Sequence, residues 1–201
     1  KITLKERNKI LDKLFQRLKG KPLSKIFGEK EFYSRQFITS EDTLDPRPET
    51  ELIVDVVKNL LQDKKKKKIN ILDVGTGSAC LIITITLELM SKLNIQSTGL
   101  DISAKALGIA RKNLIKFKLN KKINLIKSNW FERLDNKFDI IISNPPYIKK
   151  NDLDNLSKEV LFDPLISLDG GLTGLRSYFE IAKDVHQYIK NNGFVILEIG
   201  K

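Results

Sequence analysis

The chain contains few of the residues that form disulfides, bind metals or commonly act in catalysis. Its 201 residues include one cysteine, Cys80, and one histidine, His186. A lone cysteine excludes an intramolecular disulfide framework and fits a reducing compartment. One cysteine and one histidine cannot complete the usual four-ligand shell of zinc, so we expect no metal site. Cys80 has no basic partner nearby in sequence, which favours a packed thiol over a nucleophile, and His186 lies in a helical stretch where a surface role is expected.

Long uninterrupted hydrophobic runs are also absent. The longest apolar stretch, residues 78–90, is shorter than a membrane span and is interrupted by Glu88. No amino-terminal segment has the pattern of a secretion signal. We therefore expect a cytoplasmic protein without a membrane partner.

Acidic residues are outnumbered by basic ones. Lys and Arg total 36 against 25 Asp and Glu, which gives a net charge of +11. Such an excess attracts nucleic acid and other acidic partners at long range, but a lysine-rich solvated surface gives the same count. The run from Lys64 to Lys68 has the same two interpretations, a solvated loop or a docking segment. Composition therefore leaves nucleic-acid binding as an alternative.

The spacing of apolar residues predicts a short amino-terminal region followed by an α/β domain. Helical spacing covers residues 4–20, a hairpin pattern covers 29–44, and a second helix is expected to start at Pro48. Strand patterns then occupy residues 69–75, 95–101, 123–128, 138–143 and 194–200. Helical stretches separate them, although the one after the third strand is ambiguous. This alternation predicts a doubly wound, mostly parallel sheet covered on both faces.

A glycine-bearing loop, ILDVGTGSAC at residues 71–80, follows the first strand of this series. Ligands meet helix amino ends and open backbone N–H groups at such turns. In the dinucleotide fingerprint G-x-G-x-x-G, the third glycine would stand where this chain has Cys80, which weakens a pyrophosphate interpretation. Asp73, just before the loop, repels phosphate but suits a ligand with an amino group beside a sulfonium.

S-adenosylmethionine is such a ligand, with S-adenosylhomocysteine as its product, and Asp101 supports this cofactor. Asp101 ends the second strand, where a carboxylate can accept hydrogen bonds from both ribose hydroxyls. The alternative for Asp101 is a helix N-cap, although Ser103 can fill that role. Trp130, after the third strand, is a candidate to cover the adenine, with simple packing as its alternative.

The fourth strand runs directly into Asn-Pro-Pro-Tyr, in the stretch FDIIISNPPYIKK at residues 138–150. In the common strand orders this strand lies beside the first, so Asn144 should face the glycine loop. Pro145 and Pro146 make the corner stiff and extended. The Asn144 side-chain oxygen and the Pro145 carbonyl then match the two hydrogens of an NH2 group, and the Tyr147 ring can stack on a planar amide or base.

These acceptors suit methyl transfer to nitrogen. The lone pair of an amide or exocyclic amine is delocalised and weakly nucleophilic, so two acceptors would aim it at the methyl group and stabilise the developing positive charge. A proline-rich turn after a buried strand would explain Pro145 and Pro146, but not Asn144 together with Tyr147.

With these motifs joined to DPRPETE, residues 45–51, the sequence resembles the release-factor glutamine methyltransferases from about residue 21 to residue 200. Asn-Pro-Pro-Tyr alone is shared with amino-methyltransferases that act on adenine or guanine, and PRPETE is the more specific mark. Three residues depart from the family pattern: Ala79, where the family often has glycine, Asn129, where aspartate is frequent near the adenine, and Asp45, where an apolar residue is common.

The motifs and the resemblance together assign candidate roles. The cofactor-binding candidates are Asp73, Gly75, Thr76, Gly77, Ser78, Ala79, Asp101, Trp130 and Asn144. The catalytic candidates are Asn144, Pro145 and Tyr147. The substrate-binding candidates are Asn144, Pro145, Pro146, Tyr147, Pro46, Arg47 and Pro48.

The resemblance also implies a domain organisation and a partner. Residues 1–27 are expected to be a remnant of a helical substrate-recognition domain, residues 28–48 a β-hairpin linker, and residues 49–201 a methyltransferase domain that lacks its terminal strands. The expected function is methyl transfer from S-adenosylmethionine to a glutamine N5 in peptide-chain release factors. The alternatives are an amino-methyltransferase acting on adenine or guanine in RNA or DNA, and a catalytically incomplete cofactor-binding module.

Overall fold

The computed structural model describes residues 2–64 and 68–200. The interpretation of the lysine run rests mainly on residues 65–67, which lie outside the described residues. Within the described part, no helix has the length and apolar content needed to cross a membrane.

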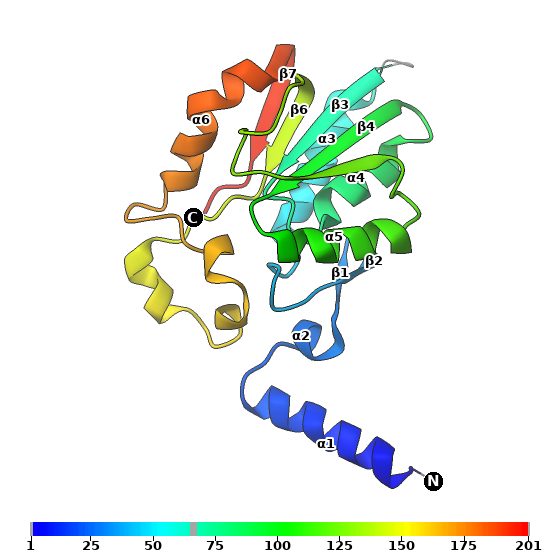
Figure 1. Cartoon of the computed structure of the whole chain (residues 1–201), viewed down its shortest axis with the longest axis vertical. Helices are drawn as coiled ribbons and strands as arrows, with labels where there is room; N and C mark the ends of the chain where they lie inside the picture. The colour runs from blue at the N-terminus through cyan, green and yellow to red at the C-terminus, as the bar shows by residue number, and fades with distance from the viewer. Residues whose placement is uncertain (1, 65–67, 201) are drawn as a thin grey trace.

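The amino-terminal region consists of two helices and the expected hairpin. Helix α1, Leu4–Leu18, starts with a capping box between Thr3 and Glu6, buries none of its side chains and extends away from the rest of the chain (Figure 1). Helix α2, Leu23–Phe27, leads into strands β1, Glu29–Phe32, and β2, Arg35–Ile38. These strands pair antiparallel, and Tyr33 and Ser34 take left-handed angles that suit a tight hairpin turn.

Five parallel strands form the main sheet in the order β5-β4-β3-β6-β7. They are β3 (Lys68–Val74), β4 (Asn94–Asp101), β5 (Ile123–Lys127), β6 (Phe138–Ser143) and β7 (Ile189–Leu197). The predicted parallel sheet is therefore confirmed, and so is the fourth strand of the series beside the first. The last strand begins at Ile189 rather than at residue 194, because Ile189 pairs with Phe138 ahead of an irregularity in the β6–β7 ladder.

Helices cover both faces of this sheet. Turn η1 (Pro48–Thr50) leads into α3 (Glu51–Leu61), whose buried side chains join those of α4 (Cys80–Leu89), α5 (Ala104–Lys116) and the hairpin in one core. A smaller core on the other face contains Phe131 and Leu134 and is covered by α6 (Arg176–Tyr188). Between β5 and β6 the described chain forms turns but no helix, which resolves the ambiguous stretch.

A long connection joins β6 to α6 and lies below the sheet in Figure 1, beside the loop that follows β2. It contains the short turns η2 (Lys150–Asn155), η3 (Val160–Phe162) and η4 (Leu165–Ser167). The carboxyl ends of β3, β4 and β6 meet at this edge of the sheet. Because the strand order reverses between β3 and β6, this edge is where open α/β sheets bind ligands.

Candidate active site

A cavity of about 350 Å³ opens at the carboxyl edge of the sheet. This volume lies within the usual range for small-molecule sites. The cavity brings together seven of the residues that the sequence predicted for cofactor or substrate, namely Gly75, Gly77, Asp101, Trp130, Asn144, Pro145 and Pro146. These residues come from four separate connections, so the fold assembles them at one place.

The glycine loop directs its backbone toward the end of β4. Gly75 and Thr76 donate their N–H groups to the carbonyl of Leu100 at 2.9 and 2.8 Å, and Gly77 donates to Asp101 Oδ2 at 2.9 Å. These three N–H groups are therefore not free to cradle a phosphate, in agreement with the weakened pyrophosphate interpretation. Gly75 and Gly77 have φ angles of 73° and 55°, and a Cβ at either would meet no atom within 4 Å. The loop thus leaves open space beside it.

Gly99, in β4, and Ala79, at the start of α4, show how tightly the glycine loop packs against its neighbours. A Cβ at Gly99, in β4, would lie 2.9 Å from Thr76 Oγ1, so glycine is needed for the close approach. The sequence signal for this close approach is a glycine inside a strand pattern, at position 99 of the run 95–101. Ala79 has a left-handed φ of 63°, a conformation that glycine adopts more easily, and it is fully buried. This explains why glycine also suits the position.

Asp101 lies at the cavity with both carboxylate oxygens held. Oδ2 accepts from the Gly77 N–H, and Oδ1 accepts from the Ser103 N–H at 2.8 Å. Ser103 is the N-cap of α5, because its side chain accepts from the N–H of Ala106 at 3.1 Å. The alternative N-cap role of Asp101 is thereby removed. Each oxygen keeps a further lone pair for a ligand, and burial raises the pKa of Asp101.

Asp73 does not line the main cavity. It is buried and accepts a hydrogen bond from Thr76 Oγ1 at 2.6 Å, and it lines a neighbouring space of about 50 Å³ together with Thr50 and Asn144. Burial raises the pKa of Asp73 to about 7 against the opposing effect of the Thr76 hydrogen bond. A cation bound close to this carboxyl group would lower its pKa again.

Asp73 is expected to make the folded state less stable as the pH rises. Its ordinary pKa is 3.8, so between pH 3.8 and about 7 the folded state holds a proton that the unfolded state releases. The free energy of unfolding should therefore decline with rising pH in this window and level off above it. Relative to the Asp73→Asn variant, the decline approaches about 1.4 kcal/mol per pH unit. Urea unfolding at pH 5, 6, 7 and 8 measures the difference, and parallel curves for the two proteins would contradict this account.

Asn144 lies at the junction of the two cavities. Its Nδ2 donates to Thr50 Oγ1 at 2.9 Å, while its Oδ1 receives no hydrogen bond from the described residues. Within residues 2–64 and 68–200 the carbonyl of Pro145 likewise accepts none. The two acceptors that the sequence placed at this corner are therefore both available to a ligand. Trp130, with a left-handed φ of 48°, lines the same main cavity.

Other predicted residues lie outside the main cavity. The Tyr147 ring packs against Gly200, where a Cβ would stand 2.7 Å from Tyr147 Cδ2, and its hydroxyl donates to Glu198 Oε1 at 3.4 Å. Pro46 and Arg47 line the small space with Thr76, Ser78 and Asp73, and Arg47 also lines a separate pocket beside Asp45 and Asp163. Pro48 begins η1. Ala79 is packed in the core beneath the loop. In this arrangement the Tyr147 ring does not line the main cavity, so it is not placed to stack on a substrate there.

Two walls of the main cavity were not identified from the sequence. One is the loop of Asp42, Thr43 and Leu44, and the other is formed by residues of the long connection, Pro164, Ile166 and Ser167. Both are stretches of mixed polarity with no motif of their own, so the sequence indicated them only through the resemblance to the family that extends from about residue 21 to residue 200.

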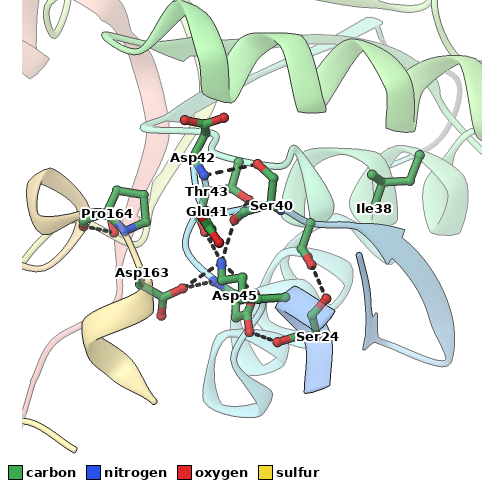
Figure 2. A network of polar contacts seen from close by, with 12 residues as sticks. Ser24, Ile38, Ser40, Glu41, Asp42, Thr43, Asp45, Asp163 and Pro164 are labelled. Atoms are coloured by element: carbon green, nitrogen blue, oxygen red, sulfur yellow. Dashed lines mark hydrogen bonds and ion pairs between the residues drawn. The ribbon is translucent and has the colours of Figure 1, made fainter. Parts of the chain in front are cut away.

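A buried charge cluster holds these two walls together. The fully buried ammonium of Lys25 lies 2.9 Å from both Asp45 Oδ1 and Asp163 Oδ1, and it donates to the carbonyls of Ser40 and Thr43 at 2.7 and 2.5 Å. Figure 2 shows Asp45 and Asp163 meeting there, with Ser24 bonded to Asp45. Asp45 stands where the family commonly has an apolar residue, and its buried carboxylate is paired with the Lys25 ammonium.

The described residues contain no group of three or more His, Cys, Asp or Glu side chains arranged to hold a metal ion. Cys80 packs against the core, and burial raises the pKa of its thiol to about 12, so it is a weak candidate for a nucleophile.

Comparison with known families and curated proteins identifies relatives of this chain. The family model "Methyltransferase small domain" matches residues 29–164. A release factor glutamine methyltransferase of Agrobacterium fabrum is 39% identical over 202 residues, which cover 99% of this chain and 69% of the relative. A bifunctional methyltransferase of Rickettsia prowazekii is 42% identical over 205 residues, but these cover 93% of this chain and only 39% of the relative.

Solved structures share the fold at low sequence identity. The hMettl16 catalytic domain, in complex with a 3'UTR hairpin, has a TM-score of 0.64 and 16% identity, with 82% of this chain and 61% of that chain covered. A ribosomal protein L11 methylase of Lactobacillus delbrueckii has a TM-score of 0.52 and 19% identity, with 84% and 68% covered. These likenesses support the α/β architecture.

Proposed function

The chain belongs to the methyltransferase small domain family and, within it, to the release factor glutamine methyltransferases, and from that premise we propose that it methylates the side-chain N5 of a glutamine in a peptide-chain release factor. It is an S-adenosylmethionine-dependent enzyme, and we propose that it acts in the cytoplasm. The division into a recognition remnant, a hairpin linker and a methyltransferase domain also remains a proposal.

The residues around the main cavity fit S-adenosylmethionine. The loop at Gly75 and Gly77 leaves open space, Asp101 offers a carboxylate with free lone pairs for the ribose hydroxyls, and Trp130 offers a flat face for the adenine. When bound, this cofactor supplies a methyl group on a positively charged sulfur. Asp73, in the adjoining small space, then suits the positive charge of the ligand's amino group.

The pair of available acceptors after β6 supports glutamine methylation best. Asn144 Oδ1 and the Pro145 carbonyl would each accept one N–H of the substrate amide, which turns the nitrogen lone pair toward the methyl group. They also stabilise the positive charge that develops on nitrogen as the new N–C bond forms and the S–C bond breaks. The surplus proton on nitrogen then passes to water, so no side-chain base is needed.

Assignment of the substrate grip to Pro146, Tyr147 and the segment Pro46–Pro48 remains part of the proposal. Arg47 is held by Asp163 at 2.5 Å, and Pro46 lines the small space, so both lie near Asn144. Tyr147 would have to leave Glu198, or support the corner from behind, to take part.

A direct test is mass spectrometry of a release factor after incubation with this protein and S-adenosylmethionine. One methyl group is expected on a single glutamine and none on a release factor in which that glutamine is replaced by alanine. A parallel incubation uses methyl-labelled cofactor and total RNA. Label that enters RNA and no release factor would favour the nucleic-acid alternative, and cofactor binding by calorimetry without transfer would favour an incomplete module.

A further inference from the structure

Three side chains from distant segments form a chain of hydrogen bonds behind the reactive corner. Asn144 Nδ2 donates to Thr50 Oγ1 at 2.9 Å, and Thr50 Oγ1 donates to Glu198 Oε2 at 2.6 Å. Thr50 ends η1, Asn144 follows β6, and Glu198 follows β7. Thr50 belongs to the PRPETE stretch and Glu198 to the segment after the last strand, but neither is among the residues to which the sequence assigned a role; both converge on the asparagine that faces the cavity.

The direction of this chain is fixed by the chemistry of its last member. A carboxylate has no proton to donate, so the single hydroxyl proton of Thr50 must point to Glu198. Thr50 Oγ1 can then offer only a lone pair to Asn144, and the side of the amide that faces Thr50 must be the NH2 group. If the Asn144 amide were flipped, a lone pair of Asn144 Oδ1 would face the lone pair of Thr50 Oγ1, which is repulsive. The amide oxygen is consequently turned to the other side.

Glu198 is itself anchored on several sides. Its backbone N–H donates to the carbonyl of Ser143 at 3.0 Å, and its own carbonyl accepts from the Tyr178 hydroxyl at 2.8 Å. The Tyr147 hydroxyl lies 3.4 Å from Oε1 as a donor. Burial, followed by the nearby Glu198 carboxylate, raises the pKa of Tyr147, which keeps this phenol protonated. The carboxylate is therefore held in place independently of Thr50.

We infer that Thr50 and Glu198 are positioning residues that lock the Asn144 amide with its oxygen toward the substrate. This inference rests on the proposed methyl transfer, because the locked oxygen is one of the two acceptors for the glutamine amide. It also gives Tyr147 a place in the site that does not require stacking: the phenol helps to hold the carboxylate that orients Asn144.

Kinetic variants of Thr50 separate positioning from general stability. Thr50→Val keeps the shape but can neither accept nor donate, and it should lower kcat about 10- to 100-fold with little change in the KM for S-adenosylmethionine. Thr50→Ser keeps the hydroxyl and should restore most of kcat. Thr84→Val is the matched control, because Thr84 is buried in α4 and its hydroxyl has no partner among the described residues; its kcat should stay at the wild-type level.

Glu198→Gln tests the direction of the chain. A glutamine amide can present either its oxygen or its nitrogen to Thr50, so a hydrogen bond between the two side chains is retained. The direction in which the Thr50 hydroxyl donates is then no longer fixed. We expect a smaller loss of kcat than in Thr50→Val, again without a matching change in cofactor KM. A Glu198→Gln loss that appears only as lower thermal stability, with wild-type kcat, would overturn the role of the carboxylate.

The side-chain NH2 signals of Asn144 give a readout that needs no catalysis. In ¹⁵N NMR spectra these signals are assigned by their loss in Asn144→Asp. Slow hydrogen exchange of one of the two protons is expected in the wild type and in Thr50→Ser, and fast exchange of both in Thr50→Val. Equal exchange in all three proteins, or wild-type kcat in Thr50→Val, would overturn the inference. A wild-type protein that protects this proton but methylates no release factor would instead count against the proposed function alone.

Discussion

Asn144→Ala is expected to lower methyl transfer to the release factor by about 100- to 1,000-fold, the loss typical of a preorganised group that stabilises transition-state charge. The variant removes one of the two acceptors assigned to the substrate amide and leaves the other, the Pro145 carbonyl. The substrate amide then keeps one hydrogen bond and can rotate, so its lone pair no longer points steadily at the methyl group. Single-turnover methylation measured by mass spectrometry gives the rate.

Two further measurements make this result interpretable. Calorimetric affinity for S-adenosylhomocysteine should change by less than about tenfold, because we propose that the glycine loop and Asp101 make most of the contacts with the cofactor. Asn155→Ala, the same change at an exposed position in η2, should methylate like the wild type. If Asn144→Ala transferred methyl groups at the wild-type rate, its part in orienting the amide would have to be abandoned.

Lys25→Met is expected to lower the free energy of unfolding by about 3–5 kcal/mol. The ammonium of Lys25 is fully buried and lies 2.9 Å from the carboxylates of Asp45 and Asp163, whose side chains are only 8% and 3% exposed. Methionine fills a similar volume but leaves these acids with too little positive charge beside them. Arg47, 2.5 Å from Asp163 Oδ2, can compensate only in part. Urea denaturation monitored by tryptophan fluorescence measures the loss.

A second substitution and a surface control identify the cause. Adding Asp45→Leu to Lys25→Met removes the uncompensated acid, and Asp163 keeps Arg47 and the backbone N–H at position 45, so about half of the lost stability or more should return. Lys105→Met breaks an exposed pair, 3.4 Å from Asp42, and should cost less than about 1 kcal/mol. Equal losses for Lys25→Met and Lys105→Met would show that burial of the cluster contributes nothing.

The sequence alone determined the elements and the general position of the site. Apolar runs bounded by glycine, proline and charged residues predicted the strands, because local spacing decides which face of an element can be buried. The common strand orders of doubly wound sheets, in which the fourth strand lies beside the first, placed Asn144 beside the glycine loop. Both expectations are confirmed by β6 lying next to β3 and by the cavity that Asn144 and Gly75 share.

Only the tertiary structure decided which polar groups meet. Thr50 and Glu198 are 148 positions apart, and Asp45 and Asp163 are 118 apart, so no local pattern could pair them. The packing of Tyr147 against Gly200, away from the cavity, also depends on how the segment after β7 crosses the Asn-Pro-Pro-Tyr corner. Local sequence determines which residues occupy a turn. Hydrogen-bond partners depend on burial instead, because a buried polar group must bond to a complementary group that the folded chain brings near it.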